Sequence, residues 1–412
     1  MYFLLLIFEG ALRKWFLPGL ATPLLVIRDP IAIWLVIKCW QRGLLPSSIY
    51  LNGMVIVGVI SVFTAIFWGH GNLFVALYGA RILVFHFPLI FVIGKIFNIE
   101  DVIKIGKATL LITIPMTVLI ALQFYSPQSA WVNRGVGGDM AGAGYSGALG
   151  FFRPPATFSF TTGTTSYYSF VACFVFYFWL NTNRINKLVL ILATVGMFAA
   201  IPLSISRGLF FQNGVTLLFT LLAVSRKPKY LSKILVAAVV VVGLLAVLSQ
   251  AGFFNTAIDA FTSRFTNASE TEGGLKGTLG DRFLGGLVGQ FLDSSDQPLF
   301  GYGIGMGTNV GSMLLAGKQT FLIAEGEWGR ILGEIGPILG LLIIAIRVAY
   351  SIKVTLASYL QLSKNNLLPW LLLSFGLLTL AQGNWAQPTY LGFSIVTAGL
   401  LLASCNPNKS IQ

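Results

Sequence analysis

Long runs of apolar residues with almost no charges recur from one end of this sequence to the other. The clearest of them lie at 49–67, 105–125, 188–203, 209–224, 234–248 and 387–403. A helix needs roughly 20 mostly apolar residues to cross the hydrocarbon core of a bilayer. Because no water is available there, each segment must satisfy its own backbone hydrogen bonds, which favours α-helices. The runs therefore predict a membrane protein with many spans.

Charged residues are too scarce for a soluble protein of this length. Of the 412 residues, 56% are hydrophobic and 10% are charged, whereas soluble proteins average about 25% charged residues. The competing membrane architecture, a β-barrel, would alternate polar and apolar residues in stretches of about 10. The run from Ile234 to Leu248 has no such alternation. We therefore predict an all-α, polytopic transmembrane helical bundle.

The apolar segments define a single integral membrane domain over residues 1–412, with about 11–12 spans. We predict these spans at 2–12, 24–40, 49–67, 73–94, 105–125, 164–180, 188–205, 209–224, 233–250, 331–350, 367–383 and 387–403. The first is short and contains Glu9, so we expect an incomplete or tilted span, and no cleavable signal-peptide pattern is present. Two connections, 126–163 and 251–330, are long.

When the connections are assigned alternately to two faces, the charges separate. One face receives 15 basic and 2 acidic residues, a balance of +13, and the other receives 12 of each. Arg347, near the end of the 331–350 segment, is counted on the basic face. Basic residues mark the cytoplasmic side, so we expect both termini in the cytoplasm and both long connections outside. The positive charge thus predicts topology and not nucleic-acid binding.

The basic residues of the outer face are mostly arginines. They are Arg13, Arg28, Arg81, Arg134, Arg153, Arg207, Arg264, Arg282 and Arg330. Positive charge on this face opposes the topology rule, so it needs another explanation. A guanidinium grips phosphate or carboxylate with two parallel hydrogen bonds, which lysine cannot do. We therefore expect an anionic substrate on the outer face.

Two stretches of the long connection at 251–330 have apolar residues at helical spacing. Phenylalanines recur through 253–265, and a second apolar pattern runs from 283 to 291, just after Arg282. Both predict amphipathic helices that lie in the membrane interface. The alternative is that these helices merely pack over the end of the bundle.

Arginines also stand at or within predicted spans, where an unpaired charge is costly. Arg207 follows Ser204-Ile205-Ser206 between two adjoining spans, and it either binds a ligand or forms a structural ion pair. Arg81 and His86 fall inside the 73–94 span, where Asp29 or Glu9 could pair with them. A histidine in such a place is more often a hydrogen-bonded core residue than a catalyst.

Glycines and acids surround the start of the 331–350 span. The alternating glycines of 301–307 lack the strand-turn-helix context of a nucleotide loop, so we predict a tight turn that allows close backbone approach. If residues 327–334 are helical, Arg330 shares a face with Glu327 and Glu334. These acids could form an ion-pair ladder, or one could act as a base beside an anion clamp.

No metal site or cofactor is predicted. Cys39, Cys173 and Cys405 are scattered and odd in number, so they suggest neither a disulfide framework nor a metal clip. Two histidines, His70 and His86, are too few for an ordinary zinc site.

Four short stretches, in this order, resemble the O-antigen polymerase and O-antigen ligase superfamily, in particular its exopolysaccharide polymerases. They are Glu9–Trp15 (EGALRKW), Ser204–Arg207 (SISR), Pro298–Gly303 (PLFGYG) and Gly333–Pro337 (GEIGP). No single stretch is specific. Their order, with a long outer loop between the second and the third, is more specific. The resemblance extends over most of the chain.

The resemblance implies a metal-independent, inverting glycosyltransferase of the bacterial inner (cytoplasmic) membrane. The donor would be an oligosaccharide on undecaprenyl pyrophosphate, joined to another sugar on the periplasmic face, with a flippase and chain-length regulators as partner proteins. Arg207 and Arg282 match family arginines that hold the pyrophosphate, and Arg153 and Arg330 are further candidates. Ligases have a His-Asn pair where this chain has Glu325-Gly326, so Glu325, or else Glu327, would be the base.

The departure at Glu325 favours a polymerase over a ligase that transfers finished glycan to another acceptor. A transporter or flippase for lipid-linked sugar is the alternative from another class. Such transporters usually contain two similar halves around a midplane site. No internal repeat is evident in this sequence, so the polymerase remains the preferred interpretation.

Overall fold

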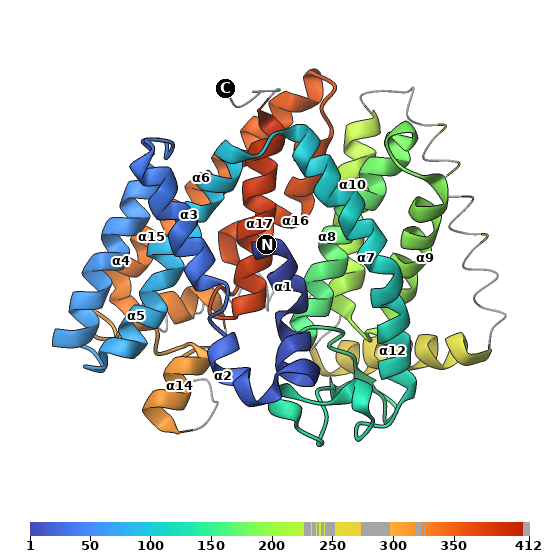
Figure 1. Ribbon diagram of the computed structural model, residues 1–412, viewed down its shortest axis with the longest axis horizontal. Coiled ribbons are helices and arrows are strands. Elements are labelled where there is room, and N and C mark those ends of the chain that lie inside the picture. The colour runs from blue at the N-terminus through green and yellow to red at the C-terminus, as the bar shows by residue number, and fades with distance from the viewer. Residues whose placement is uncertain are drawn as a thin grey trace.

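The computed structural model describes residues 1–225, 252–272, 297–317, 323–324 and 326–406, with isolated positions at 232, 236, 239 and 243. Within these ranges the chain is predominantly helical (Figure 1). The one sheet in the described residues pairs β1 (Tyr145–Ser146) with β2 (Phe152–Arg153), antiparallel. The predicted all-α class is confirmed. The predicted span at 233–250 and the predicted helix at 283–291 lie in ranges that are not described.

The long helices run up and down through the molecule (Figure 1). They are α3 (Asp29–Gln41), α4 (Ile49–Phe67), α5 (Leu73–Arg81) continued by η3 (Ile82–His86) and α6 (Phe87–Ile96), α7 (Ile99–Tyr125), α8 (Thr161–Leu180), α9 (Lys187–Leu203), α10 (Arg207–Ser225), α15 (Glu327–Ser363), α16 (Leu368–Gln382) and α17 (Pro388–Cys405). Seven helices in the described ranges are long and apolar enough to cross a membrane, and two shorter apolar helices accompany them. The chain is therefore a polytopic helical membrane protein.

The two ends of the bundle differ. One end, the loop end, carries the irregular segment 126–160 and the helices α2 (Ala21–Leu24), α12 (Gly252–Glu272) and α14 (Asn309–Ala316) (Figure 1). The other end, the turn end, carries short connections such as 97–98 and 181–186 and the end of α17. The described parts of the two long connections predicted for one face lie at the same end.

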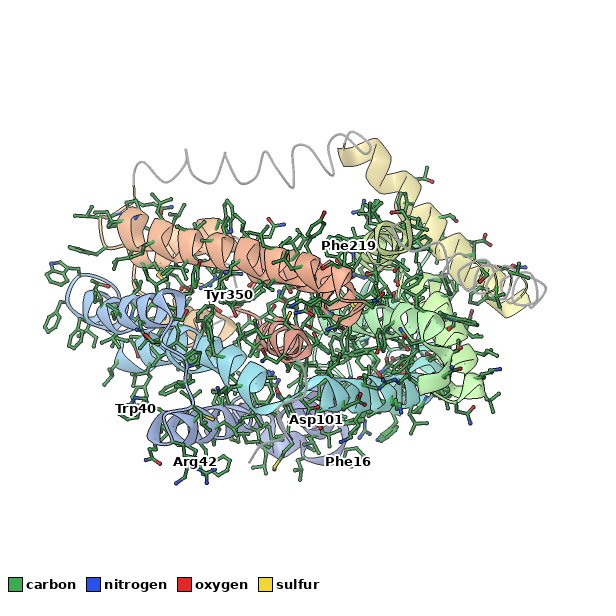
Figure 2. The ribbon with its side chains drawn as sticks, turned by 90° about the horizontal axis from the view of Figure 1, so that it is seen from above. Phe16, Trp40, Arg42, Asp101, Phe219 and Tyr350 are labelled. Atoms are coloured by element: carbon green, nitrogen blue, oxygen red, sulfur yellow. The ribbon has the colours of Figure 1, made fainter. Side chains whose placement is uncertain are left out.

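Polar groups inside the bundle are satisfied locally. Thr109, Thr113 and Thr117 of α7 each donate to the carbonyl four residues earlier, at 2.8 Å. In the bilayer core no water is available to accept a hydrogen bond from a hydroxyl. Because each threonine donates to its own helix backbone, α7 can carry threonines on a buried face. Apolar side chains occupy the perimeter instead: Trp40 and Phe16 project outward and Tyr350 lies inside (Figure 2).

Helix boundaries differ from the apolar runs, and two of the differences have clear causes. α7 begins at Ile99 and not at 105, because Asn98 and Asp101 form a capping box that starts the helix among charged residues. α15 continues to Ser363 and not to 350, and ends where Asn365 adopts a left-handed conformation with φ of 61°. Hydropathy marks the lipid-facing part of a helix, and caps decide where the helix ends.

The predicted amphipathic helix at 253–265 is confirmed as α12. It lies across the loop end (Figure 1), with Phe254, Ala257 and Ala260 buried. Phe261 and Phe265 contact the ring of Phe210 on α10, with centroids 6.0 and 5.9 Å apart. This apolar face packs on the bundle. The sequence also allowed this alternative, in which the helix packs over the end of the bundle.

Candidate functional site

Three arginines from separate elements converge at the loop end, and we refer to Arg153, Arg207 and Arg264 as the outer arginine cluster. Arg153 lies on β2, where its cross-strand neighbour is Tyr145. Its guanidinium carbon is 6.0 Å from the centre of the Tyr145 ring. The hairpin thus fixes one guanidinium over an aromatic face in a loop that is otherwise irregular.

Arg207 is the first residue of α10 and follows a turn of three residues after α9. In that turn Ile205 is fully buried and has a positive φ of 47°, which is strained for a β-branched residue. The Ser206 hydroxyl accepts from the Leu209 amide and lies 3.0 Å from the Thr165 hydroxyl of α8. These contacts hold the start of α10, and with it Arg207, against the bundle.

Arg264 belongs to α12 and reaches back to the hairpin. Its guanidinium donates to the carbonyl oxygens of Ser146 and Gly147, at 3.3 and 3.5 Å. Nothing in the sequence distinguished Arg264 from the other outer arginines. Its proximity to Arg153 follows from the path of α12 across the loop end.

Burial and neighbouring charges both act on the guanidinium of Arg153. Burial first, and then the charge of Arg264, lower the pKa of Arg153 to about 10; Tyr145 opposes this shift, and Arg207 adds a smaller lowering effect. Its Nε is buried and makes no hydrogen bond within the described part of the chain. A bound anion would accept from such groups and relieve the repulsion. The cluster therefore has the electrostatics of an anion site.

Backbone strain gathers around the same place. Four non-glycine residues in the described ranges have positive φ: Leu149, Ala156, Ile205 and Asn365. Asn365 follows the end of a helix, where this conformation is ordinary. The other three lie within seven residues of Arg153 or Arg207 along the chain. Strain of this kind persists where the surroundings enforce it and is concentrated at functional sites.

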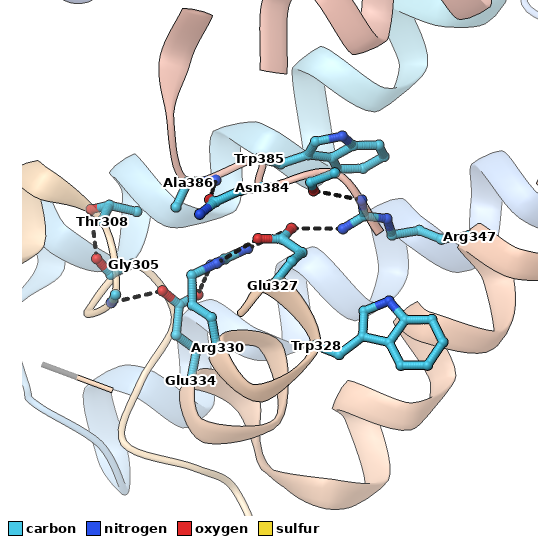
Figure 3. Close-up of polar contacts among 12 residues, drawn as sticks. Gly305, Thr308, Glu327, Trp328, Arg330, Glu334, Arg347, Asn384, Trp385 and Ala386 are labelled. Atoms are coloured by element: carbon cyan, nitrogen blue, oxygen red, sulfur yellow. Dashed lines mark hydrogen bonds and ion pairs between the residues drawn. The ribbon is translucent and has the colours of Figure 1, made fainter. Parts of the chain in front are cut away.

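Two further arginines, Arg330 and Arg347, are buried in ion pairs with Glu327 and Glu334 (Figure 3). We call these four residues the buried charge network. Arg330 donates to both oxygens of Glu327 at 2.9 and 3.0 Å and to Glu334 at 2.6 Å. Arg347 donates to Glu327 at 2.6 Å. The predicted shared face of Glu327, Arg330 and Glu334 is confirmed.

The assignment of Arg347 to the basic face was wrong. It is 1% exposed, donates to the carbonyls of Leu380 and Gly383, and lies 3.7 Å from the centre of the Trp385 ring. In a straight helix, residues 327 and 347 would be about 30 Å apart. Gly336, with φ of 78° and ψ of 168°, breaks α15, so residues 327–335 fold back on the rest of the helix and bring Glu327 to Arg347.

The glycine run 301–307 packs against this folded segment. Gly301, Gly303 and Gly305 have positive φ, and the amides of Tyr302 and Gly303 donate to the carbonyls of Gly333 and Glu334, each at 2.8 Å. The amide of Gly307 donates to Glu334 at 2.8 Å. The tight turn predicted here is confirmed. The backbone that it approaches closely belongs to the folded segment of α15.

Little space remains beside the buried charge network. A cavity of about 20 Å³ is lined by Glu327, Arg330, Glu334 and Arg347 together with apolar residues, which is enough for one water molecule. The two carboxylates balance the two guanidiniums. Glu327 and Arg330, predicted as a base and an anion ligand, are thus held by each other.

The remaining predicted site residues divide into two groups. Arg153 and Arg207 come together, with Arg264 as a third member. Arg282 and Glu325 lie outside the described residues. No group of three or more His, Cys, Asp or Glu residues within the described ranges is placed to hold a metal ion.

Ion pairs predicted for the 73–94 segment are confirmed. Arg81 donates to both oxygens of Asp29, at 2.6 and 2.8 Å, and His86 Nε2 lies 2.9 Å from the same carboxylate. The Nε2–H tautomer leaves Nδ1 to accept from the Tyr2 hydroxyl at 3.1 Å. Glu9 pairs instead with Arg28, at 2.9 Å. Asp29 is partly buried and the other groups are buried, which fits the core role that is more common for such a histidine.

Comparison with known proteins adds no relative: no family model, no curated protein and no solved structure matches the chain.

Proposed function

We propose that the chain is a glycosyltransferase that joins oligosaccharide repeat units carried on undecaprenyl pyrophosphate, acting at the loop end. The observation that carries the proposal is the convergence of Arg153, Arg207 and Arg264, with the pKa of Arg153 lowered by burial and by the neighbouring positive charges. A lipid diphosphate is an anionic group that lies at the membrane surface. Two of the three arginines were expected to bind it.

The chemistry needs few protein groups. Pyrophosphate leaves readily once its developing charge is stabilised, and preorganised guanidiniums can do this electrostatically. Aromatic side chains near the cluster, such as Tyr145 and Phe160, whose ring centroids are 5.5 Å apart, suit the apolar faces of sugars. The bilayer, adjoining the exposed apolar perimeter, would hold the polyprenyl tail.

The base is assigned to Glu325 in preference to Glu327. Both oxygens of Glu327 accept hydrogen bonds from guanidiniums, so they are already engaged within the protein. Glu325 stands two residues earlier, just before the folded segment of α15. We further propose that the loop end faces the periplasm of a bacterial inner membrane and that both termini lie in the cytoplasm, as the charge distribution favours.

Reconstituted protein tests the proposal. Supplied with purified repeat units on undecaprenyl pyrophosphate, the wild type should yield products that lengthen by whole repeats. Arg207→Gln should abolish this growth, whereas Arg184→Gln, which breaks an exposed pair with Glu100 at the turn end, should not. Normal growth by the Arg207 variant would contradict the proposal. A single transfer to another acceptor would identify a ligase, and sugar movement across vesicles without joining would identify a transporter.

A further inference from the structure

A pocket at the turn end, far along the bundle from the outer arginine cluster, has the composition of a binding site. Its volume is about 570 Å³, within the range of roughly 300 to 1,000 Å³ that is typical of ligand pockets. It is enclosed by the α3–α4 connection, the junction of α6 and α7, α15, and the end of α17. We call it the turn-end pocket.

The turn-end pocket contains two cations without matching acids. Lys95 and Lys353 line it, both are exposed, and neither forms an ion pair with a described residue. Lys353 lies 5.2 Å from the centre of the Tyr50 ring. The nearest acids along the chain, Glu100 and Asp101, do not line the pocket, and each is paired with a base elsewhere.

Two hydroxyls of the pocket lack partners. Tyr350 is 2% exposed, and within the described residues its hydroxyl makes no hydrogen bond. The same holds for the buried hydroxyl oxygen of Ser48. Tyr350 is held by rings on three sides, from Tyr50, Phe87 and Phe91. A buried hydroxyl without a hydrogen bond destabilises the protein, so a ligand that accepts or donates hydrogen bonds here would stabilise the fold.

An apolar pocket adjoins the turn-end pocket and extends it toward the middle of the bundle. The two share Pro46 and Ser47, and the second has a volume of about 710 Å³. Its wall is mostly apolar, with Val36, Val55, Ile56, Val84 and Phe85 among the lining residues. Ile56 stands seven residues inside α4, which places it about 10 Å below the helix start. The apolar pocket thus reaches the depth of acyl chains.

We propose that the two pockets together bind one anionic phospholipid. Its phosphate accepts hydrogen bonds from Lys95, Lys353 and Ser48, and one acyl chain occupies the apolar pocket. The charge complementarity and the depth of each pocket argue for this occupant. A zwitterionic lipid would add a cation beside two lysines, and a soluble anion would leave the apolar pocket unused. The turn end is also the basic end, where an anionic membrane surface attracts lysine.

Delipidated protein in a neutral detergent, titrated with phosphatidylglycerol or phosphatidylcholine and followed by native mass spectrometry, tests the proposal. We expect one phosphatidylglycerol to bind in preference to phosphatidylcholine. Lys95→Gln combined with Lys353→Gln should weaken binding about thirtyfold, from roughly 1 kcal/mol for each lysine. The matched control is Lys107→Gln with Lys364→Gln, which removes two exposed charges outside the pocket and should leave binding unchanged.

Tyr350→Phe keeps the aromatic packing and removes only the hydroxyl, so a further, smaller loss of affinity would support a headgroup at this depth. Equal binding of the two lipids, or equal losses in the two lysine pairs, would overturn the proposal. Competition by millimolar inorganic phosphate alone would show a phosphate site without a lipid. Tighter binding of undecaprenyl phosphate than of phosphatidylglycerol would show a carrier-lipid site. Either result would overturn the assignment to a membrane phospholipid.

Discussion

The outer arginine cluster and the buried charge network use the same side chain in opposite ways. In the network, Arg330 and Arg347 are almost fully buried, and two carboxylates match their charges. In the cluster, Arg153 lies beside Arg264 and Arg207, and burial together with these charges lowers its pKa to about 10. A guanidinium that is already neutralised by the protein supports the fold, whereas the buried Nε of Arg153, which makes no hydrogen bond to a described residue, can donate to an external anion.

The difference also separates what local sequence encodes from what the fold assembles. Glu327, Arg330 and Glu334 meet because they are three and four residues apart on one helix. Arg153, Arg207 and Arg264 come from a hairpin, a helix start and a transverse helix. Substitutions in the network should therefore change stability first, and those in the cluster should change activity first.

The largest effect is expected for Glu327→Ala. It would leave Arg330 with one carboxylate and Arg347 with none, and breaking a buried pair typically costs about 3–5 kcal/mol. Thermal unfolding in detergent should show this loss directly. The control Glu100→Ala breaks an ion pair whose side chains are about half exposed, which is worth at most about 1 kcal/mol. Similar losses for the two variants would remove the distinction between buried and exposed pairs.

Next in size is the effect of Arg153→Gln on activity. Loss of one preorganised donor to a developing anion typically slows the chemical step about 100- to 1,000-fold, and we expect a loss of this order in the polymerisation assay. Removal of a repelled charge should leave the melting temperature unchanged or raise it.

The companion variant Arg153→Lys keeps the charge but not the two-pronged hydrogen bonding. It should recover only part of the activity, and full recovery would show that charge alone is required. A fall in stability as large as that of Glu327→Ala would place Arg153 with the structural arginines.

Much of the fold could be predicted from hydropathy. Runs such as 49–67 coincide with helices because a span must be apolar throughout its length. Helix ends could not be predicted in the same way. The start of α7 depends on the Asn98 cap, and the fold-back of α15 depends on the conformation of Gly336, which the GEIGP stretch does not reveal.

The site was less predictable. The pairing of Asp29 with Arg81 could be anticipated, because a buried arginine requires an acid and few acids were available. The buried position of Arg347 could not be predicted. It stands near the end of an apolar run, where a basic residue normally marks the cytoplasmic end of a span. Arg264 lacked any local signal, since its role depends on where α12 crosses the loop end.

Lys14 sharpens the comparison because it is a buried cation with neither a carboxylate nor an adjoining cluster. Its ammonium donates to the Ala156 carbonyl at 2.6 Å, and burial lowers its pKa from 10.5 to about 7. Between these values the unfolded chain binds more protons than the folded one, so stability should rise with pH. From pH 7 to 9 the gain should be about 2–3 kcal/mol, at 1.36 kcal/mol per unit.

Unfolding of Lys14→Met in detergent across the same pH range checks this assignment, because methionine fills much of the space and cannot titrate. The variant should lose most of the rise with pH, while Lys107→Met, exposed on α7, should retain it. A wild-type stability that falls between pH 7 and 9 would contradict the assignment, since it would require Lys14 to be charged and stabilised in the folded protein.

The smallest effect concerns how Arg207 is positioned. Thr165→Val keeps the shape of the side chain but removes its hydroxyl contact with Ser206, worth about 1 kcal/mol, and should lower activity roughly fivefold. Thr162→Val, on the same helix as Thr165, is the matched control, because the Thr162 hydroxyl donates to Gln387 and not to Ser206. Thr165→Val and Ser206→Ala both remove the contact between these two hydroxyls, and Ser206→Ala also removes the hydroxyl that accepts from the Leu209 amide. If the contact holds the start of α10, the double variant should lose no more activity than Ser206→Ala alone. Additive losses would mean that Arg207 is fixed by the strained turn at Ile205 and not by the hydroxyl pair.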